Sequence, residues 1–173
     1  MGKVIKFRMG KNKNEIQRER NNMKEFIKLV VYLANNCKKE IYRTKLNKLL
    51  FYTQFLYYKD KQERLLEDDF YYDYFGPVLL NLDEKLERLE EANIITLVKD
   101  DYGTIIEANV RIDNELYDED EREVLDKVIR KFDDWSSKKL SNYSHDEDFW
   151  KNYYCKGEVI DINNALTLKD VDN

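Results

Sequence analysis

Residues 43–58 read RTKLNKLLFYTQFLYY, and this stretch decides the fold. Its apolar residues recur at intervals of three and four, which predicts a helix from about Arg43 to Tyr58 with Thr44 as the N-cap. Aromatic residues widen its apolar surface beyond a single stripe. A helix that is apolar over most of its circumference is usually surrounded by other elements. We therefore expect this helix at the centre of the domain.

The flanking sequence indicates the elements that surround this helix. Gly76-Pro77 is typical of a helix start, because proline is tolerated at the first helical position. Serine or aspartate followed three residues later by glutamate marks further helix starts. Two short apolar runs separated by a polar, glycine-containing segment predict a β-hairpin. The expected elements are helices over residues 14–36, 43–58, 77–92, 118–139 and 144–156, and strands over residues 94–98 and 104–110.

The composition favours helices over an all-β fold. The 173 residues include five glycines and one proline, too few for a turn-rich sandwich. Lys, Glu and Leu are abundant, and these residues favour helices. The prediction is a mainly α (α+β) fold, a single-domain helical bundle of about five helices with a small antiparallel β-hairpin. Residues 14–173 form this domain, and residues 1–13 form a basic N-terminal arm.

Charge is distributed unevenly along the chain. The net charge is −5, but residues 1–20 carry +5, which leaves −10 on residues 21–173. An acidic body repels nucleic-acid phosphates, which bind mainly to Lys and Arg. Nucleic acid is therefore expected only at the arm, and a protein partner fits this charge better. The charged residues among the first twenty are Lys3, Lys6, Arg8, Lys11, Lys13, Arg18 and Arg20 against Glu15 and Glu19.

The sequence lacks the features of a membrane or secreted protein. It has no run of about 18 apolar residues and no signal-peptide core. Cys37 and Cys155 stand far apart, without the spacing of a metal site. These features favour a cytoplasmic protein with two incidental thiols and no membrane insertion.

Few residues suggest catalysis. His145 is the single histidine, and no nucleophile–base pair, metal-ligand spacing or glycine-rich phosphate loop accompanies it. We expect Ser144 and Glu147 to cap a helix, with His145 in its first turn paired to a carboxylate or a backbone group. Gly76-Pro77 is interpreted as a structural turn. The expectation is a protein that is not an enzyme and holds no metal or cofactor.

The aromatic content is more informative about function. Thirteen Tyr, eight Phe and two Trp exceed what one small core needs. Tyrosine presents a broad, rather rigid surface with one polar tip, which suits interfaces. We expect Tyr58, Tyr71, Tyr72 and Tyr154 to form an exposed partner-binding patch. The aromatic residues expected in the core are Phe51, Phe55, Phe132, Trp135 and Trp150.

Three segments together resemble the Panacea domain, the SocA/GepA-like family associated with antitoxins. They are KLNKLLFY at residues 45–52, the aromatic-GPV turn at residues 70–78, and the LSxxSHxExxW pattern at residues 140–150. The resemblance implies a bacterial or phage protein that grips another protein, since family members neutralise unrelated toxins and some deliver a toxin to a protease. The motif residues, with an expected structural role, are Lys45, Leu49, Leu50, Tyr52, Gly76, Pro77, Ser144, His145, Glu147 and Trp150.

These observations favour a protein-binding neutraliser. Its partner would be a toxin or, for a factor of a mobile element, a host defence or nucleic-acid-processing protein. A DNA-binding transcription regulator is the first alternative, because a helix followed by a hairpin resembles part of a winged helix. The outer face of the helix over residues 77–92 is acidic, however, whereas a recognition helix should be basic. A proteolytic adaptor that delivers a toxin to a protease is the third reading.

Overall fold

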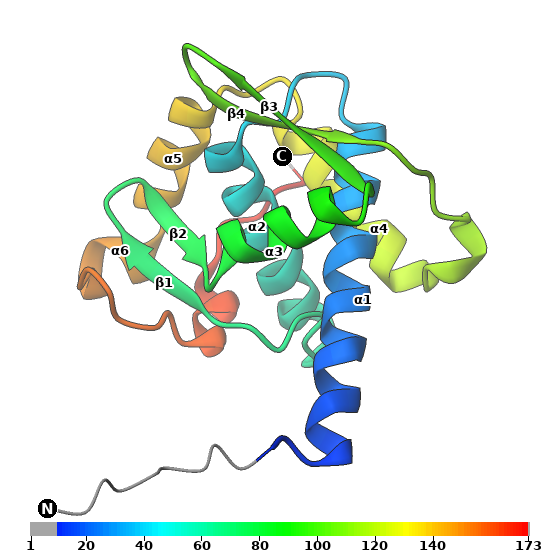
Figure 1. Ribbon diagram of the computed structural model, residues 1–173. Coiled ribbons are helices and arrows are strands. Elements are labelled where there is room, and N and C mark those ends of the chain that lie inside the picture. The colour runs from blue at the N-terminus through cyan, green and yellow to red at the C-terminus, as the bar shows by residue number, and fades with distance from the viewer. Residues whose placement is uncertain (1–9, 173) are drawn as a thin grey trace, which may run out of the picture.

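The computed structural model describes residues 10–172, and helix α2 (Arg43–Lys61) lies at its centre. Every side chain from Lys45 to Leu56 is buried, and the other elements enclose the helix (Figure 1). The prediction of a central helix is confirmed. The predicted N-cap is wrong: Tyr42 occupies the cap position, without a side-chain capping hydrogen bond, and Thr44 is the second helical residue.

Six α-helices and two 3₁₀ turns form within residues 10–172. Helix α1 starts with a capping box, because the Asn12 side chain accepts from the Glu15 N–H (2.9 Å) and the Glu15 carboxylate accepts from the Asn12 N–H (3.0 Å). Residues 1–9 of the predicted arm lie outside the described residues. Besides α2, the helices are α1 (Lys13–Asn36), α3 (Leu82–Glu91), α4 (Glu119–Phe132), α5 (Ser137–His145) and α6 (Asp148–Tyr153), with 3₁₀ turns η1 (Asn114–Leu116) and η2 (Ile162–Thr167).

Two antiparallel hairpins accompany the helices. The predicted hairpin is present as β3 (Ile95–Asp100) and β4 (Gly103–Ala108). The other, β1 (Phe70–Asp73) with β2 (Gly76–Leu79), lies where the sequence predicted a helix start. That prediction was wrong, and α3 begins later, at Leu82.

Pro77 fits strand β2 because the residue opposite it, Tyr72, hydrogen-bonds to a different segment. Pro77 stands opposite Tyr72 in the β1–β2 ladder. The Tyr72 N–H points to the other side and donates to the Glu158 carbonyl (3.0 Å). The missing N–H of Pro77 therefore leaves no unpaired partner in the ladder.

The predicted helix over residues 118–139 is two helices. Helix α4 ends at Phe132, and the Asp133 carboxylate then accepts from the N–H groups of Lys38 and Lys39 (3.0 Å each). Helix α5 begins after Ser136, whose hydroxyl accepts from the Lys139 N–H (3.1 Å). Ser136 thus satisfies a backbone N–H that a continuous helix would have paired, whereas Asp133 binds the segment that follows α1.

The order of elements resembles that of a winged helix. Between α1 and α2, Tyr42 pairs with Ile105 of β4, and the Ile106 N–H donates to the Ile41 carbonyl (2.9 Å). The chain thus runs helix, short strand, helix, helix and hairpin, with β1–β2 inserted and α4–α6 added at the end (Figure 1). This arrangement confirms a mainly α fold with a small hairpin. Within residues 10–172, no helix is long and apolar enough to cross a membrane.

Candidate protein-interaction surface

The three sequence motifs meet beneath the β1–β2 turn. Lys48 of α2 is buried, and its ammonium donates to the Pro77 carbonyl (3.0 Å). Gly76 has a φ of +107° and leaves no room for a side chain: an added Cβ would lie 2.4 Å from Lys48 Cε and 2.6 Å from Ser144 Oγ. Glycine is required here both for its backbone conformation and for this close packing. The turn is therefore held against α2 and α5.

Glu147 connects the first motif to the third. Its carboxylate accepts from the Tyr52 hydroxyl and from the Lys169 N–H, both at 3.0 Å. The side chain is fully buried, and this burial raises the pKa of Glu147. We call Lys48, Tyr52, Gly76, Ser144 and Glu147 the motif scaffold.

The predicted capping role of Ser144 and Glu147 is wrong. Ser144 and His145 are the last residues of α5, and the Ser144 hydroxyl donates to the Ser141 carbonyl (2.7 Å). Glu147 precedes α6, but its side chain makes no capping hydrogen bond. Both side chains have other partners, and for Glu147 these lie far away in sequence. The S-x-x-E spacing therefore suggested a local helix cap where Glu147 makes long-range hydrogen bonds.

His145 also departs from its predicted role. Its ring stacks on Trp150, with centroids 4.5 Å apart, and its Nε2 atom is buried without a hydrogen-bond partner. Burial, together with the nearby Lys48 ammonium, lowers the pKa of His145, so the ring is neutral at neutral pH. The predicted pairing with a carboxylate or backbone group is therefore wrong. No group of side chains within residues 10–172 has a metal-binding arrangement.

Three further motif residues are buried in the core. Leu49 and Leu50 are fully buried, and the Lys45 ammonium donates to the Asp133 carbonyl (2.6 Å). Burial lowers the pKa of Lys48 to about 7, although the Asp73 carboxylate opposes this shift. Neutral and charged Lys48 therefore coexist near pH 7.

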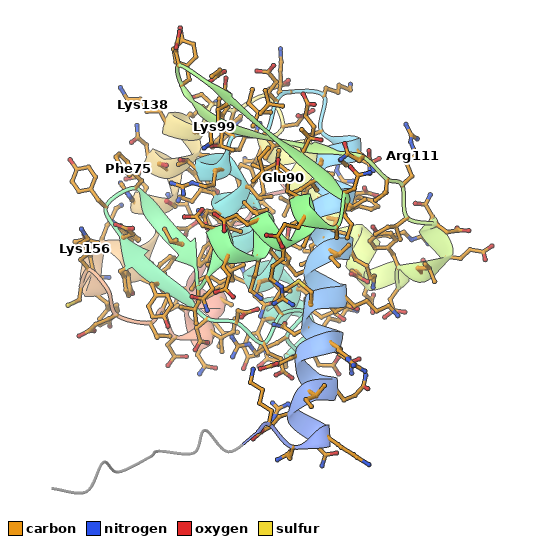
Figure 2. All side chains as sticks on the ribbon, in the orientation of Figure 1. Phe75, Glu90, Lys99, Arg111, Lys138 and Lys156 are labelled. Carbon is orange, nitrogen blue, oxygen red and sulfur yellow. The ribbon has the colours of Figure 1, made fainter. Side chains whose placement is uncertain are left out.

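The β1–β2 turn and the end of α6 carry exposed aromatic side chains. Tyr74 and Phe75 form the two-residue turn of the β1–β2 hairpin, and they are 69% and 62% exposed, with ring centroids 5.0 Å apart. In helix α6 and just after it, Tyr153 and Tyr154 are also exposed. Figure 2 shows Phe75 pointing outward on the same side of the molecule as Lys156, which follows α6. We call Tyr74, Phe75, Tyr153 and Tyr154 the aromatic surface.

The predicted patch of four tyrosines coincides with this surface only at Tyr154. Tyr72 is 4% exposed, so its predicted exposure is wrong: its ring lies against Trp150 (5.3 Å) and Tyr154 (6.0 Å), and its hydroxyl donates to the Phe149 carbonyl (3.2 Å). Tyr71 is half-buried beside Val159, and Tyr58 is half-buried with its hydroxyl 3.3 Å from Asn163. The alternation of the four-residue strand β1 places Tyr72 inward.

The sequence analysis did not predict three residues of the aromatic surface. Tyr74 and Phe75 were assigned to no regular element, and Tyr153 was placed on a helix without a predicted face. The signal that could have revealed the first two is the glycine after Phe75, which is typical of a tight hairpin turn whose central side chains face water. Among the predicted core residues, Trp135 is half-buried; Phe51, Phe55, Phe132 and Trp150 are buried.

Comparison with known families agrees with this geometry. A family model described as "Antitoxin SocA-like, Panacea domain" matches residues 46–151, more than half of the chain. The match includes α2 from Leu46, both hairpins, and α3 to the first turn of α6. No curated protein and no solved structure matches the chain. Membership supports an antitoxin-type role, with a protein such as a toxin as partner. The chain therefore belongs to the SocA-like antitoxin family with a Panacea domain.

Proposed function

We propose that this protein is an antitoxin-type neutraliser that inhibits a partner protein by binding it directly through the aromatic surface. The observation that carries the proposal is the exposure of Tyr74 and Phe75 on a turn that the family motifs hold in place. The water-facing part of a large aromatic side chain gains nothing from burial in its own fold. Contiguous exposed apolar side chains commonly mark a protein-binding site.

The rigidity of the turn supports this role. Lys48 contacts the turn from below, and Gly76 packs against both Lys48 and Ser144. A turn whose backbone is already held in place loses little conformational entropy when a partner binds, so more of the contact energy appears as affinity. Tyrosine, with two rotatable torsions, has the same advantage and is enriched among residues that dominate interfaces.

A cross-linking experiment in the native host tests the contact. A photo-reactive phenylalanine analogue replaces Phe75 in one strain and Tyr102 in another. Tyr102 lies at the β3–β4 turn, is 89% exposed and lies outside the aromatic surface. We expect the Phe75 analogue to cross-link to the toxic product of an adjacent gene, identified by mass spectrometry, and the Tyr102 analogue to leave it free.

Substitution then measures how much the surface contributes. With the purified partner, Tyr74→Ala/Phe75→Ala should weaken binding about 30-fold, as expected for loss of an interface hot spot of about 2 kcal/mol. It should also abolish neutralisation in a growth assay. The matched control is Tyr102→Ala/Leu166→Ala, which removes two exposed apolar side chains elsewhere. Equal binding by both double variants, with unchanged thermal midpoints, would contradict the proposal.

DNA binding is a second candidate function, favoured by the winged-helix order of elements. Helix α3 occupies the position of a recognition helix. Its exposed side chains include Glu84, Glu87, Glu90 and Glu91, with Arg88 as the exposed base. Such a helix repels the phosphates that flank the major groove. A gel shift at moderate salt with the DNA upstream of its own gene tests this candidate, and specific retardation would favour it.

A further inference from the structure

A second concave surface lies away from the aromatic surface, between the first half of α1, helix α3 and the segment over residues 112–116. It encloses about 750 Å³. The first turns of α1 project beyond the rest of the fold and form one wall (Figure 1). We call this surface the α1 groove. The motif residues do not line it, so its role differs from that of the motif scaffold.

The floor of the α1 groove is apolar. Ile16, Met23 and Ile27 lie along one face of α1, and Ile112 and Leu116 line the groove with them. Leu116 is 59% exposed, and Ile16 is also exposed. Met23 and Ile27 are half-buried against the core, and the apolar stripe of α1 extends beyond them to the exposed Ile16. This extension lacks a covering element among the described residues.

The rim of the α1 groove is positively charged. Arg20, Lys24 and Arg88 line it and form no ion pair within residues 10–172. Two of the three acids that line the groove are paired, because Lys85 binds Asp68 (2.9 Å) and Lys11 binds Glu19; the third, Glu84, is exposed and forms no ion pair within residues 10–172. Three unpaired cations against one unpaired carboxylate therefore leave the groove positively charged, in a chain whose net charge is −5.

We infer that the α1 groove binds an amphipathic helix of a protein partner, with apolar residues on one face and Asp or Glu along its edges. An apolar groove between helices accepts the apolar face of a further helix, whose anchors recur at three- and four-residue spacing. The cations on the rim attract carboxylates and repel basic segments.

The charge of residues 1–9 argues against this segment of the chain as the occupant of the groove. Residues 1–9 precede the groove residue Lys11 and contain apolar side chains that would suit the floor. They also carry Lys3, Lys6 and Arg8 and no acidic residue, so the rim repels them. Nucleic acid fits no better: the rim cations could bind phosphates, but the aliphatic floor offers bases no aromatic ring on which to stack. The inferred site is independent of the neutralising contact proposed above.

Designed peptides provide the probe. One is an 18-residue acetylated and amidated peptide with Leu at helical spacing and Glu and Ala elsewhere; its counterpart has Lys in place of Glu. Binding to the full-length protein is measured by titration calorimetry and by methyl NMR signals of Ile16 and Ile112. We expect the Glu peptide to bind at least about tenfold more tightly than the Lys peptide, a difference of about 1.4 kcal/mol, and to shift both signals.

Charge reversal tests whether the rim causes this preference. In Arg20→Glu/Lys24→Glu/Arg88→Glu the preference should invert in favour of the Lys peptide. The control is Lys39→Glu/Lys138→Glu/Lys156→Glu, which changes the net charge equally at exposed positions elsewhere and should keep the original preference. Thermal midpoints verify that both variants fold.

Three results would overturn the inference. The first is a Glu peptide that leaves the Ile16 and Ile112 signals unmoved. The second is an equal effect of the two triple variants, since general attraction would then explain the preference. The third is concentration-dependent self-association in sedimentation experiments that the rim variant abolishes, because a second copy of the chain would then be the occupant.

Discussion

The motif scaffold is buried and the start of α1 (residues 13–21) is exposed, and different interactions hold the two regions in place. In the scaffold, buried side chains from α2, β2 and α5 contact one another across long stretches of sequence. At the start of α1 every side chain is exposed, and an ion pair between exposed Arg18 and Glu67 (3.2 Å) connects it to the rest of the fold. Exposed ion pairs contribute little stability.

This contrast implies two kinds of surface. The scaffold fixes the turn that carries Tyr74 and Phe75, so the aromatic surface is preorganised before a partner arrives. The start of α1 relies on its local capping box, and short helical segments without tertiary packing are only marginally stable in water. A partner in the α1 groove would therefore contribute the packing that this segment lacks.

The largest expected effect is that of Gly76→Ala. The new Cβ would meet Lys48 Cε and Ser144 Oγ, and alanine is strained at a φ of +107°. Overpacking and backbone strain together should lower the free energy of unfolding by about 3 kcal/mol. Urea denaturation followed by circular dichroism measures this loss.

Glycine 10 supplies the control for that substitution. Nothing lies within 4 Å of a Cβ added there. Gly10→Ala should therefore change the free energy of unfolding by less than about 0.5 kcal/mol. Similar free energies of unfolding for the two variants would show that the turn accommodates a side chain at residue 76, contrary to its close packing.

The next effect concerns pH. Burial lowers the pKa of Lys48 from 10.5 to about 7 in the folded protein. Between these values the unfolded chain binds more protons than the folded one, so stability should rise as pH increases. The free energy of unfolding should gain up to about 1.4 kcal/mol per pH unit between pH 7 and pH 9.

Two variants isolate the contribution of Lys48. Lys48→Met should remove this rise in stability, as measured by urea denaturation at several pH values. Lys24→Met should retain it, because Lys24 is exposed on α1 and meets water in both states. An identical rise in the wild type and in Lys48→Met would assign the pH dependence to other groups.

The sequence predicted those elements whose own residue pattern indicates which side chains are buried. The central helix and the β3–β4 hairpin were predictable because their residues show the pattern of burial directly. The β1–β2 hairpin was not, since four-residue strands give too little alternation and Gly76-Pro77 also suits a helix start. Its partners, Lys48 and residues 157–160, are distant in sequence.

The candidate site was predictable in part. The motif residues were predicted to have a structural role, and the Ser144–Glu147 pattern was interpreted as a helix cap. The Glu147 carboxylate instead accepts from the hydroxyl of Tyr52, which lies on α2. The aromatic excess indicated an exposed surface, but which tyrosines face outward depends on strand register. A one-residue difference in register exchanges Tyr71 with Tyr72.

The smallest expected effect distinguishes the two regions most directly, because it applies the same change to two helix starts. Asn12 caps α1, and Ser136 caps α5, which packs on α2. Loss of a side-chain cap typically costs about 1 kcal/mol. In Ser136→Ala this cost should appear in global unfolding. In Asn12→Ala the first turns should fray on their own, so global stability should fall by less than about 0.3 kcal/mol.

Hydrogen exchange shows where the loss of the Asn12 cap destabilises the chain. The amides of residues 14–18 should exchange about fivefold faster in Asn12→Ala, the equivalent of about 1 kcal/mol, while those of α2 exchange at the wild-type rate. If Asn12→Ala instead lowered global stability as much as Ser136→Ala, the start of α1 would belong to the cooperative core. The α1 groove would then be a rigid site like the aromatic surface, and occupancy by a partner helix would contribute affinity without ordering the helix that forms its wall.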